Sequence, residues 1–269
     1  QGATTVAIGQ NAGYNVQGNN SIAVGYQAGY ADQGSKSVAL GIQAAQNQQG
    51  NNAVAIGNQA GIADQGTSSV AIGDQAGSDN QGNQAVAVGI FAGYGNQGTA
   101  GVAVGQSAGT NAQGANATAI GTNSGQVSQG AASVAIGQAA AKNQQGYDSV
   151  AVGRDAGKNS QGINCVAMGY LAGENAHGAS CVAIGKETGR TSQGANSVAV
   201  GAAAGQGSQG VNSIALGVLA GNNAQPDSST YFSTYAMRNQ GGTYYMRYNT
   251  SSGEVSYTSS DDRVKDGET

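Results

Sequence analysis

A sixteen-residue period runs through the first 224 residues and constrains the fold more than any other feature. A triplet of a large residue, an alanine and a second large residue occurs fourteen times at this spacing, without insertion or deletion. The triplets begin at Val6, Ile22, Val38, Val54, Val70, Val86, Val102, Thr118, Val134, Val150, Val166, Val182, Val198 and Ile214. A Gln-Gly pair keeps the same period from Gln17 to Gln209, and only His177 replaces the glutamine.

The length of this period predicts a β-solenoid. Sixteen residues are too few for a helical-hairpin repeat of ~34 residues or a propeller blade of ~40. They fit one coil with two short strands and two turns. The alternation inside each triplet is typical of a strand, and the glycines supply turns. Because one inserted residue would exchange the two faces of a strand, the constant spacing keeps every coil in register. We therefore expect an all-β fold of parallel coils stacked ~4.8 Å apart.

The two faces of the triplet differ in size. The outer positions are large, as in Val6 and Ile8, whereas the middle position is alanine in all fourteen copies. The residue before each triplet is also small, as in Ser21 and Cys165. We expect the aliphatic face to fill the interior of the coil and the small face to approach a second copy of the chain at the axis of a homo-oligomer. The alternative is that small residues merely suit a tight solenoid.

Composition excludes several functions. With 47 glycines, 5% aromatic and 9% charged residues, the chain cannot fill a thick core. The net charge of −4 disfavours nucleic acid as a partner, because phosphate binding needs clustered Lys and Arg. No apolar run approaches the ~20 residues of a membrane span, so we expect no membrane insertion. The sequence opens in mid-pattern without a signal-peptide profile, which indicates a fragment or a processed product.

Polar and reactive residues inside the repeat are interpreted as scaffold. The glutamine column predicts a ladder of stacked amides, in which His177 is a substitute hydrogen-bonding group. Cys165 and Cys181 lie one coil apart in one column. Adjacent parallel strands give poor disulfide geometry, so free thiols are expected. No metal cluster is present, and the glycine-rich segments lack the strand–loop–helix context of a phosphate site. We therefore predict no metal and no cofactor.

One repeat also carries a family resemblance. The segment Ser69-Val70-Ala71-Ile72-Gly73 resembles the head repeats of trimeric autotransporter adhesins, and the likeness extends over residues 1–224. The resemblance implies a homotrimer of left-handed parallel β-rolls. This agrees with the expected close approach of a second chain.

The composition changes where the repeats end. Pro226 takes the place of the glycine of the Gln-Gly pair, and six of the twelve tyrosines follow it. Two alternating segments, 243–249 and 254–257, are typical of a β-hairpin. We interpret residues 225–258 as a Tyr-rich cap or neck that covers the exposed edge of the last coil.

Residues 259–269 resemble, together with the hairpin, the junction of viral and phage fibres that carry a C-terminal intramolecular chaperone. The resemblance implies self-cleavage between Ser260 and Asp261, with Ser260 as nucleophile and Lys265 as the group that activates its hydroxyl. Catalysis needs its groups held in place, and the chaperone body is missing, so we predict no protease activity and no other enzymatic activity for this chain. The alternative is a polar tail in which Ser-Asp occurs by chance.

The variable turn positions supply the candidate binding residues. Exposed tyrosines can stack on sugars or contact a receptor. The alternative is that they are scattered surface residues without a binding role. The candidates are Tyr14, Tyr26, Tyr30, Tyr94 and Tyr170. Asp32 and Asp64 share a column, and paired carboxylates would suit glycoside cleavage. Acidic side chains that point outward from a rod are usually solvated, and we interpret Asp32 and Asp64 as solvated surface residues.

The function expected from these features is mechanical. Our leading hypothesis is a homotrimeric virion fibre or tail spike on the virion surface, which attaches to a host glycan or receptor through three weak contacts that gain avidity. The alternatives are the head of a bacterial cell-surface adhesin, a glycan-depolymerising fibre and an ice-binding solenoid. The last would need a flat array of threonines, and the outward columns are irregular.

Overall fold

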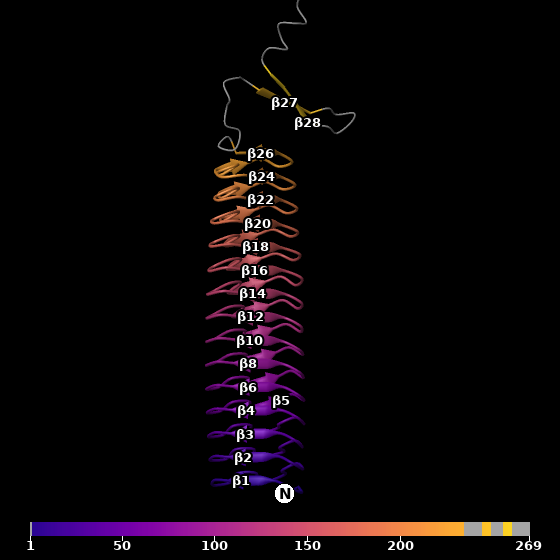
Figure 1. Cartoon of the computed structure of the whole chain (residues 1–269), viewed down its shortest axis with the longest axis vertical. Helices are drawn as coiled ribbons and strands as arrows, with labels where there is room; N and C mark the ends of the chain where they lie inside the picture. Colours follow the sequence, from indigo (N-terminus) through magenta and orange to yellow (C-terminus); the bar gives the residue numbers. More distant parts are fainter. Residues whose placement is uncertain (1, 234–243, 249–254, 260–269) are drawn as a thin grey trace, which may run out of the picture. The chain divides into compact units, whose positions relative to one another are not determined.

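The computed structural model describes residues 2–233, 244–248 and 255–259. The chain divides into two compact units, residues 1–233 and 234–269. The first unit is a parallel β-solenoid with one coil for every sixteen residues (Figure 1), as the period predicts. Among the described residues no helix is long and apolar enough to cross a membrane.

The fourteen triplets and the segment Thr230–Phe232 form one long parallel sheet of 15 strands. Its strands are β1 (Val6–Ile8), β2 (Ile22–Val24), β3 (Val38–Leu40), β4 (Val54–Ile56), β6 (Val70–Ile72), β8 (Val86–Val88), β10 (Val102–Val104), β12 (Thr118–Ile120), β14 (Val134–Ile136), β16 (Val150–Val152), β18 (Val166–Met168), β20 (Val182–Ile184), β22 (Val198–Val200), β24 (Ile214–Leu216) and β26 (Thr230–Phe232). Equivalent residues pair across coils, so Ala103 lies between Ala87 and Ala119.

The glutamine column forms a second parallel sheet, of 11 strands. Its strands are β5 (Ala63–Gln65), β7 (Asp79–Gln81), β9 (Gly95–Gln97), β11 (Asn111–Gln113), β13 (Val127–Gln129), β15 (Asn143–Gln145), β17 (Asn159–Gln161), β19 (Asn175–His177), β21 (Ser192–Gln193), β23 (Ser208–Gln209) and β25 (Ala224–Gln225). In the first coils this column is reduced to isolated bridges, such as that between Gln17 and Gln33. The expected two strands per coil are therefore complete only from the fourth coil onward.

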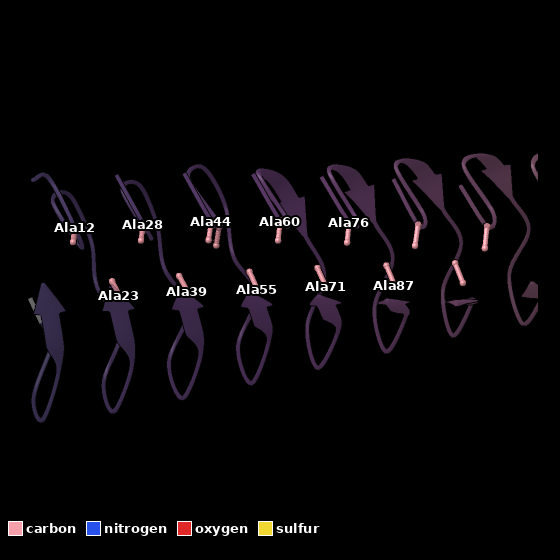
Figure 2. Packing of buried hydrophobic residues seen from close by; sticks show 14 of the residues in the cluster. Ala12, Ala23, Ala28, Ala39, Ala44, Ala55, Ala60, Ala71, Ala76 and Ala87 are labelled. Atoms are coloured by element: carbon pink, nitrogen blue, oxygen red, sulfur yellow. The ribbon is translucent and has the colours of Figure 1, made fainter. Parts of the chain in front are cut away.

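The interior of the coil is built from alanine, which corrects our assignment of the faces. The middle alanines of the triplets, such as Ala23 and Ala39, are fully buried. They face a second column of alanines from the opposite turn, such as Ala28 and Ala44 (Figure 2). The large outer residues of the triplet point outward instead, and Ile8 remains 60% exposed. The expectation that the aliphatic face fills the interior is wrong.

The distance between the two walls explains this arrangement. The side chain of Gln97 starts on one wall, and its Nε2 donates to the backbone oxygen of Val86 on the other at 2.9 Å. A single glutamine side chain thus spans the interior. Only alanine, serine and similarly small residues fit beside it, because protein interiors are close-packed.

Glycine is required where each triplet strand turns. Gly73 has a φ of +131°, and a Cβ there would lie 2.6 Å from the backbone oxygen of Gly89 in the next coil. L-residues rarely adopt this φ, and the neighbouring backbone cannot move away without breaking the stack. The glycine that follows each of the fourteen triplets therefore allows the coils to stack at strand spacing.

Parallel pairing continues past residue 224, the end of the predicted repeat domain. Strand β25 pairs with β23, and β26 pairs with β24 so that Tyr231 stands in register with Ala215. Pro226 follows β25 where earlier coils have a glycine whose N–H donates to the next coil, as Gly210 does to Gln225. Because proline has no N–H, it removes that donor at the end of the ladder.

The described residues of the second unit form one antiparallel pair. Strand β27 (Tyr244–Tyr248) pairs with β28 (Val255–Ser259), and Met246 stands opposite Tyr257. This confirms the strands of the predicted hairpin.

Candidate functional site: the outer faces of the solenoid

The outward side of the triplet sheet is a continuous apolar surface, which we call the aliphatic face. It consists of the first and third residues of each triplet. Away from the first coil, the exposed fraction is 43% at Leu40, 37% at Ile136 and 41% at Met168. Monomeric soluble proteins rarely expose an apolar patch that continues over so many strands, and such patches mark interaction sites. The aliphatic face is thus the strongest interaction surface of the solenoid.

The opposite wall carries a second surface, which we call the outer turn surface. It consists of the residues five and eight positions after each triplet begins. The two positions of one coil approach each other: Asp155 forms a 3.0 Å ion pair with Lys158, and the rings of Phe91 and Tyr94 meet edge to face at 5.7 Å. Side chains from successive coils therefore form two neighbouring columns along the solenoid.

Over the first coils the outer turn surface is aromatic and amidic. Tyr14 and Tyr30 stack with their ring centroids 5.3 Å apart and their planes 3° from parallel. The neighbouring column is a chain of amides. Nε2 of Gln59 donates to Oε1 of Gln43 at 3.0 Å, and Nε2 of Gln43 donates to Oε1 of Gln27 at 3.3 Å.

Farther along the solenoid the same surface is charged. Arg190 contacts Glu174 at 2.8 Å and Glu187 at 3.8 Å. The hydrogen bond that Arg190 donates to the carboxylate of Glu174 raises the pKa of Arg190 above its ordinary value. Nearby, the guanidinium of Arg154 lies 4.3 Å from the ring centroid of Tyr170. These charges are paired with one another or placed over an aromatic ring, so they stabilise the local surface.

The predicted binding tyrosines do not form one site. Tyr14, Tyr26 and Tyr170 are exposed, whereas Tyr30 and Tyr94 are half-buried. Only Tyr14 and Tyr30 contact each other, and Tyr94 packs on Phe91.

The other predicted site residues divide into two groups. Ser260, Asp261 and Lys265 of the predicted cleavage junction lie outside the described residues. Asp32 and Asp64 stand in one column but two coils apart, about 10 Å by the spacing of stacked strands.

The buried polar column is a hydrogen-bonded ladder, as predicted. Nε2 of Gln81 donates to the backbone oxygen of Val70 at 2.9 Å and to Oε1 of Gln97 at 3.1 Å. His177 takes one place in this ladder and contacts Oε1 of Gln193 through Nε2. Burial lowers the pKa of His177 from 6.5 to about 4, and the hydrogen bond with Gln193 opposes part of this effect.

The two cysteines are free and buried. Sγ of Cys165 donates to the backbone oxygen of Gly178 at 2.8 Å, and Sγ of Cys181 donates to that of Gly194 at 2.9 Å. Serine hydroxyls make related backbone contacts in the same column, as in the hydrogen bond from Ser149 to Gly162. Within the described ranges, His, Cys, Asp and Glu form no group of three that could hold a metal ion.

A comparison with protein families matches two segments of the chain. The YadA head domain repeat matches the chain in two copies, at residues 1–28 and 65–92. Each copy contains triplets of the long sheet, so the solenoid carries YadA-type head repeats. No curated protein and no solved structure matches the chain.

Proposed function

We propose that this chain is an attachment head of a bacterial cell-surface adhesin, in which three copies associate along the aliphatic face. The YadA head domain repeat at residues 1–28 and 65–92 supports an adhesin-type head, and YadA head domains are trimeric. The observation that carries the proposal is the aliphatic face itself, which a solitary chain leaves exposed along the whole triplet sheet.

The association has a simple physical basis. Covering the outer residues of the triplets removes apolar surface from water, which favours assembly at roughly 25 cal/mol per Å². Because every coil presents the same two positions in register, copies that lie side by side match along their length. A trimer would present each outer turn surface in three copies, so weak contacts with a host surface would gain avidity.

The test compares charged substitutions on the two walls. We expect the purified solenoid to have the mass of a trimer by light scattering. The double variant Ile72→Asp/Ile136→Asp should have a lower mass, because charges on the aliphatic face prevent association. Val16, which is 57% exposed but lies outside the triplets, provides the matched control Val16→Asp, for which the mass should not change. A monomeric parent chain, or a trimer that survives the double substitution, would reject the proposal. Cells that display the trimeric head should adhere to host cells better than cells that display the double variant.

A second candidate is the virion fibre. It rests on residues 259–265 with the neighbouring hairpin, as the sequence predicts. The two candidates differ in what a longer gene product does. A fibre would release a C-terminal chaperone that begins at Asp261, and Ser260→Ala would prevent the release. If mass spectrometry finds no such fragment, the fibre candidate fails and the adhesin head is unaffected.

A further inference from the structure

We infer that the first two coils carry a binding platform for an uncharged glycan, formed by Tyr14, Tyr30 and Gln27 on the outer turn surface. This inference rests on the proposed attachment function and names the class of partner. We call these three residues the Tyr14 platform.

The aromatic part of the platform is pre-organised. Tyr14 and Tyr30 stack at 5.3 Å with nearly parallel planes, so each ring supports the other although Tyr14 is 63% exposed. A hexose has a face of C–H groups that packs on an aromatic ring, and a ring that is already ordered loses little conformational freedom when it binds. Neither phenolic hydroxyl has a hydrogen-bond partner among the described residues, so both are available to a ligand.

The amide part of the platform is a terminal donor. The chain of amides runs from Gln59 through Gln43 to Gln27, whose Oε1 also accepts from Nε2 of Gln46 at 2.9 Å. Oε1 of Gln27 therefore accepts two hydrogen bonds, whereas Nε2 donates to no described residue. Because hydrogen bonds in a chain polarise one another, the N–H group at the end of the chain is a stronger hydrogen-bond donor. A sugar hydroxyl beside the tyrosine rings would accept from this group.

The charge of the surroundings selects the glycan. Tyr14, Tyr30, Gln27 and Gln43 are uncharged residue types. The charged residues nearest in sequence to Tyr30 are Asp32 and Lys36, which are both exposed and of opposite sign, so this part of the chain offers an anionic glycan no net positive charge. The cations of the outer turn surface, Lys142, Lys158 and Arg190, lie more than a hundred residues farther along, and Lys158 and Arg190 are held in ion pairs. A neutral hexose polymer fits this environment better than a sialylated or sulfated one.

The platform stays accessible when the chain assembles. The turn alanines behind the platform, such as Ala28, face the triplet alanines across the interior (Figure 2). The platform and the aliphatic face therefore belong to opposite walls of the coil. Oligomerisation through the aliphatic face leaves the Tyr14 platform on the outside, in one copy per chain.

The experiment uses the full chain on an array of neutral glucans, galactans and mannans, with heparin and dextran sulfate as anionic counterparts. We expect binding to a neutral polysaccharide that persists at high salt. The double variant Tyr14→Ala/Tyr30→Ala should weaken binding roughly tenfold or more, since it removes both the exposed ring of Tyr14 and the Tyr30 ring on which it stacks. Tyr14→Phe should retain most of the affinity, and Gln27→Ala should weaken it less than the double variant does.

Tyr147 provides the matched control, because it is 53% exposed and lies in a different turn. Tyr147→Ala should bind as the parent chain does. The inference fails if the parent chain binds no neutral glycan on the array, if it binds only the anionic polymers and loses them in salt, or if the double variant binds unchanged. Far-UV circular dichroism and thermal melting verify that the variants are folded. A double variant that stays trimeric and still promotes cell adhesion would reject the platform while leaving the adhesin head intact.

Discussion

His177 makes the stability of the solenoid depend on pH in a way that can be isolated by one substitution. His177 is only 4% exposed and occupies a place that glutamine fills in the other described coils. Nε2 contacts Oε1 of Gln193, whereas Nδ1 is buried without a partner within the described part of the chain. Protonation would therefore place a charge in the thin interior with no acceptor for the second N–H.

The magnitude follows from the two pKa values of the ring. The pKa falls from the ordinary 6.5 to about 4 in the folded chain, chiefly because burial disfavours the charged form. Above pH 6.5 the ring is neutral in both states, and the full stability is present. As pH falls below 6.5, His177 binds a proton in the unfolded chain but not in the folded chain, so the free energy of unfolding decreases. This decrease levels off below about pH 4. Since a tenfold change in proton affinity is worth about 1.4 kcal/mol, the total loss is about 3 kcal/mol per chain.

The assay is guanidinium unfolding of the parent chain and of His177→Gln over the same pH series. At neutral pH we expect the variant to be equally stable or about 1 kcal/mol more stable, because an amide can accept from Gln161 and donate to Gln193. Between pH 6.5 and about 4, the advantage of the variant should grow by about 3 kcal/mol. Carboxylates titrate in both chains and cancel in the difference. A difference between the two chains that stays constant across the series would refute the reasoning.

Two further substitutions test the packing of the coils. Gly73→Ala should cost about 3 kcal/mol, because it combines a disallowed φ with a contact of 2.6 Å to the backbone of Gly89. The matched control is Gly95→Ala, where the nearest atom lies at 3.4 Å and φ is ordinary, and denaturant titration should show a change below about 1 kcal/mol. Equal losses at the two sites would contradict the steric argument. Cys165→Ser should alter the melting temperature little, since Ser149 fills the same column with a hydroxyl that donates to a backbone oxygen. A large loss would mean that the thiol has a packing role that serine cannot supply.

Much of the architecture could be predicted because the period determines it. Once a triplet recurs without an inserted residue, register follows, and Ala103 must stand beside Ala87 and Ala119. The glutamine ladder is predictable for the same reason, since identical amides at one position of stacked coils can bond only to each other and to nearby backbone. Gln81 shows both contacts.

The assignment of the faces failed because size alone does not say which side of a strand is interior. Large aliphatic residues usually face inward, but here the interior is spanned by one glutamine side chain, as the contact of Gln97 with Val86 shows. The signal that could have identified the interior is the second column of small residues, represented by Ala28 and Ala44. Two columns of alanine in one coil indicate two walls that approach closely.

The outer turn surface was the least predictable part. Its columns follow from the period, but the contact between positions five and eight depends on turn residues with positive φ, such as Gln27 at 53° and Phe91 at 55°. Non-glycine residues seldom adopt this region, so sequence pattern alone does not indicate it. The stacking of Tyr14 on Tyr30 and the direction of the amide chain became visible only with the turn geometry.

Reversing the faces changes the physical reason for oligomerisation and explains what each column tolerates. If alanine lay at the seam between chains, close backbone approach would hold the assembly together. With alanine inside, large apolar side chains form the contact between chains. Their burial is favourable whatever the exact shape of each side chain, because the hydrophobic effect is non-directional. The third triplet position accordingly varies among Val24, Leu40, Met168 and Ile184, whereas the middle position is alanine in all fourteen triplets. A methyl group added to the interior would press on a wall held at hydrogen-bonding distance by the glutamine ladder, and the same group added to the seam would meet another chain that can shift. The aliphatic face is therefore where such a repeat can vary while it keeps both its coil and its capacity to associate.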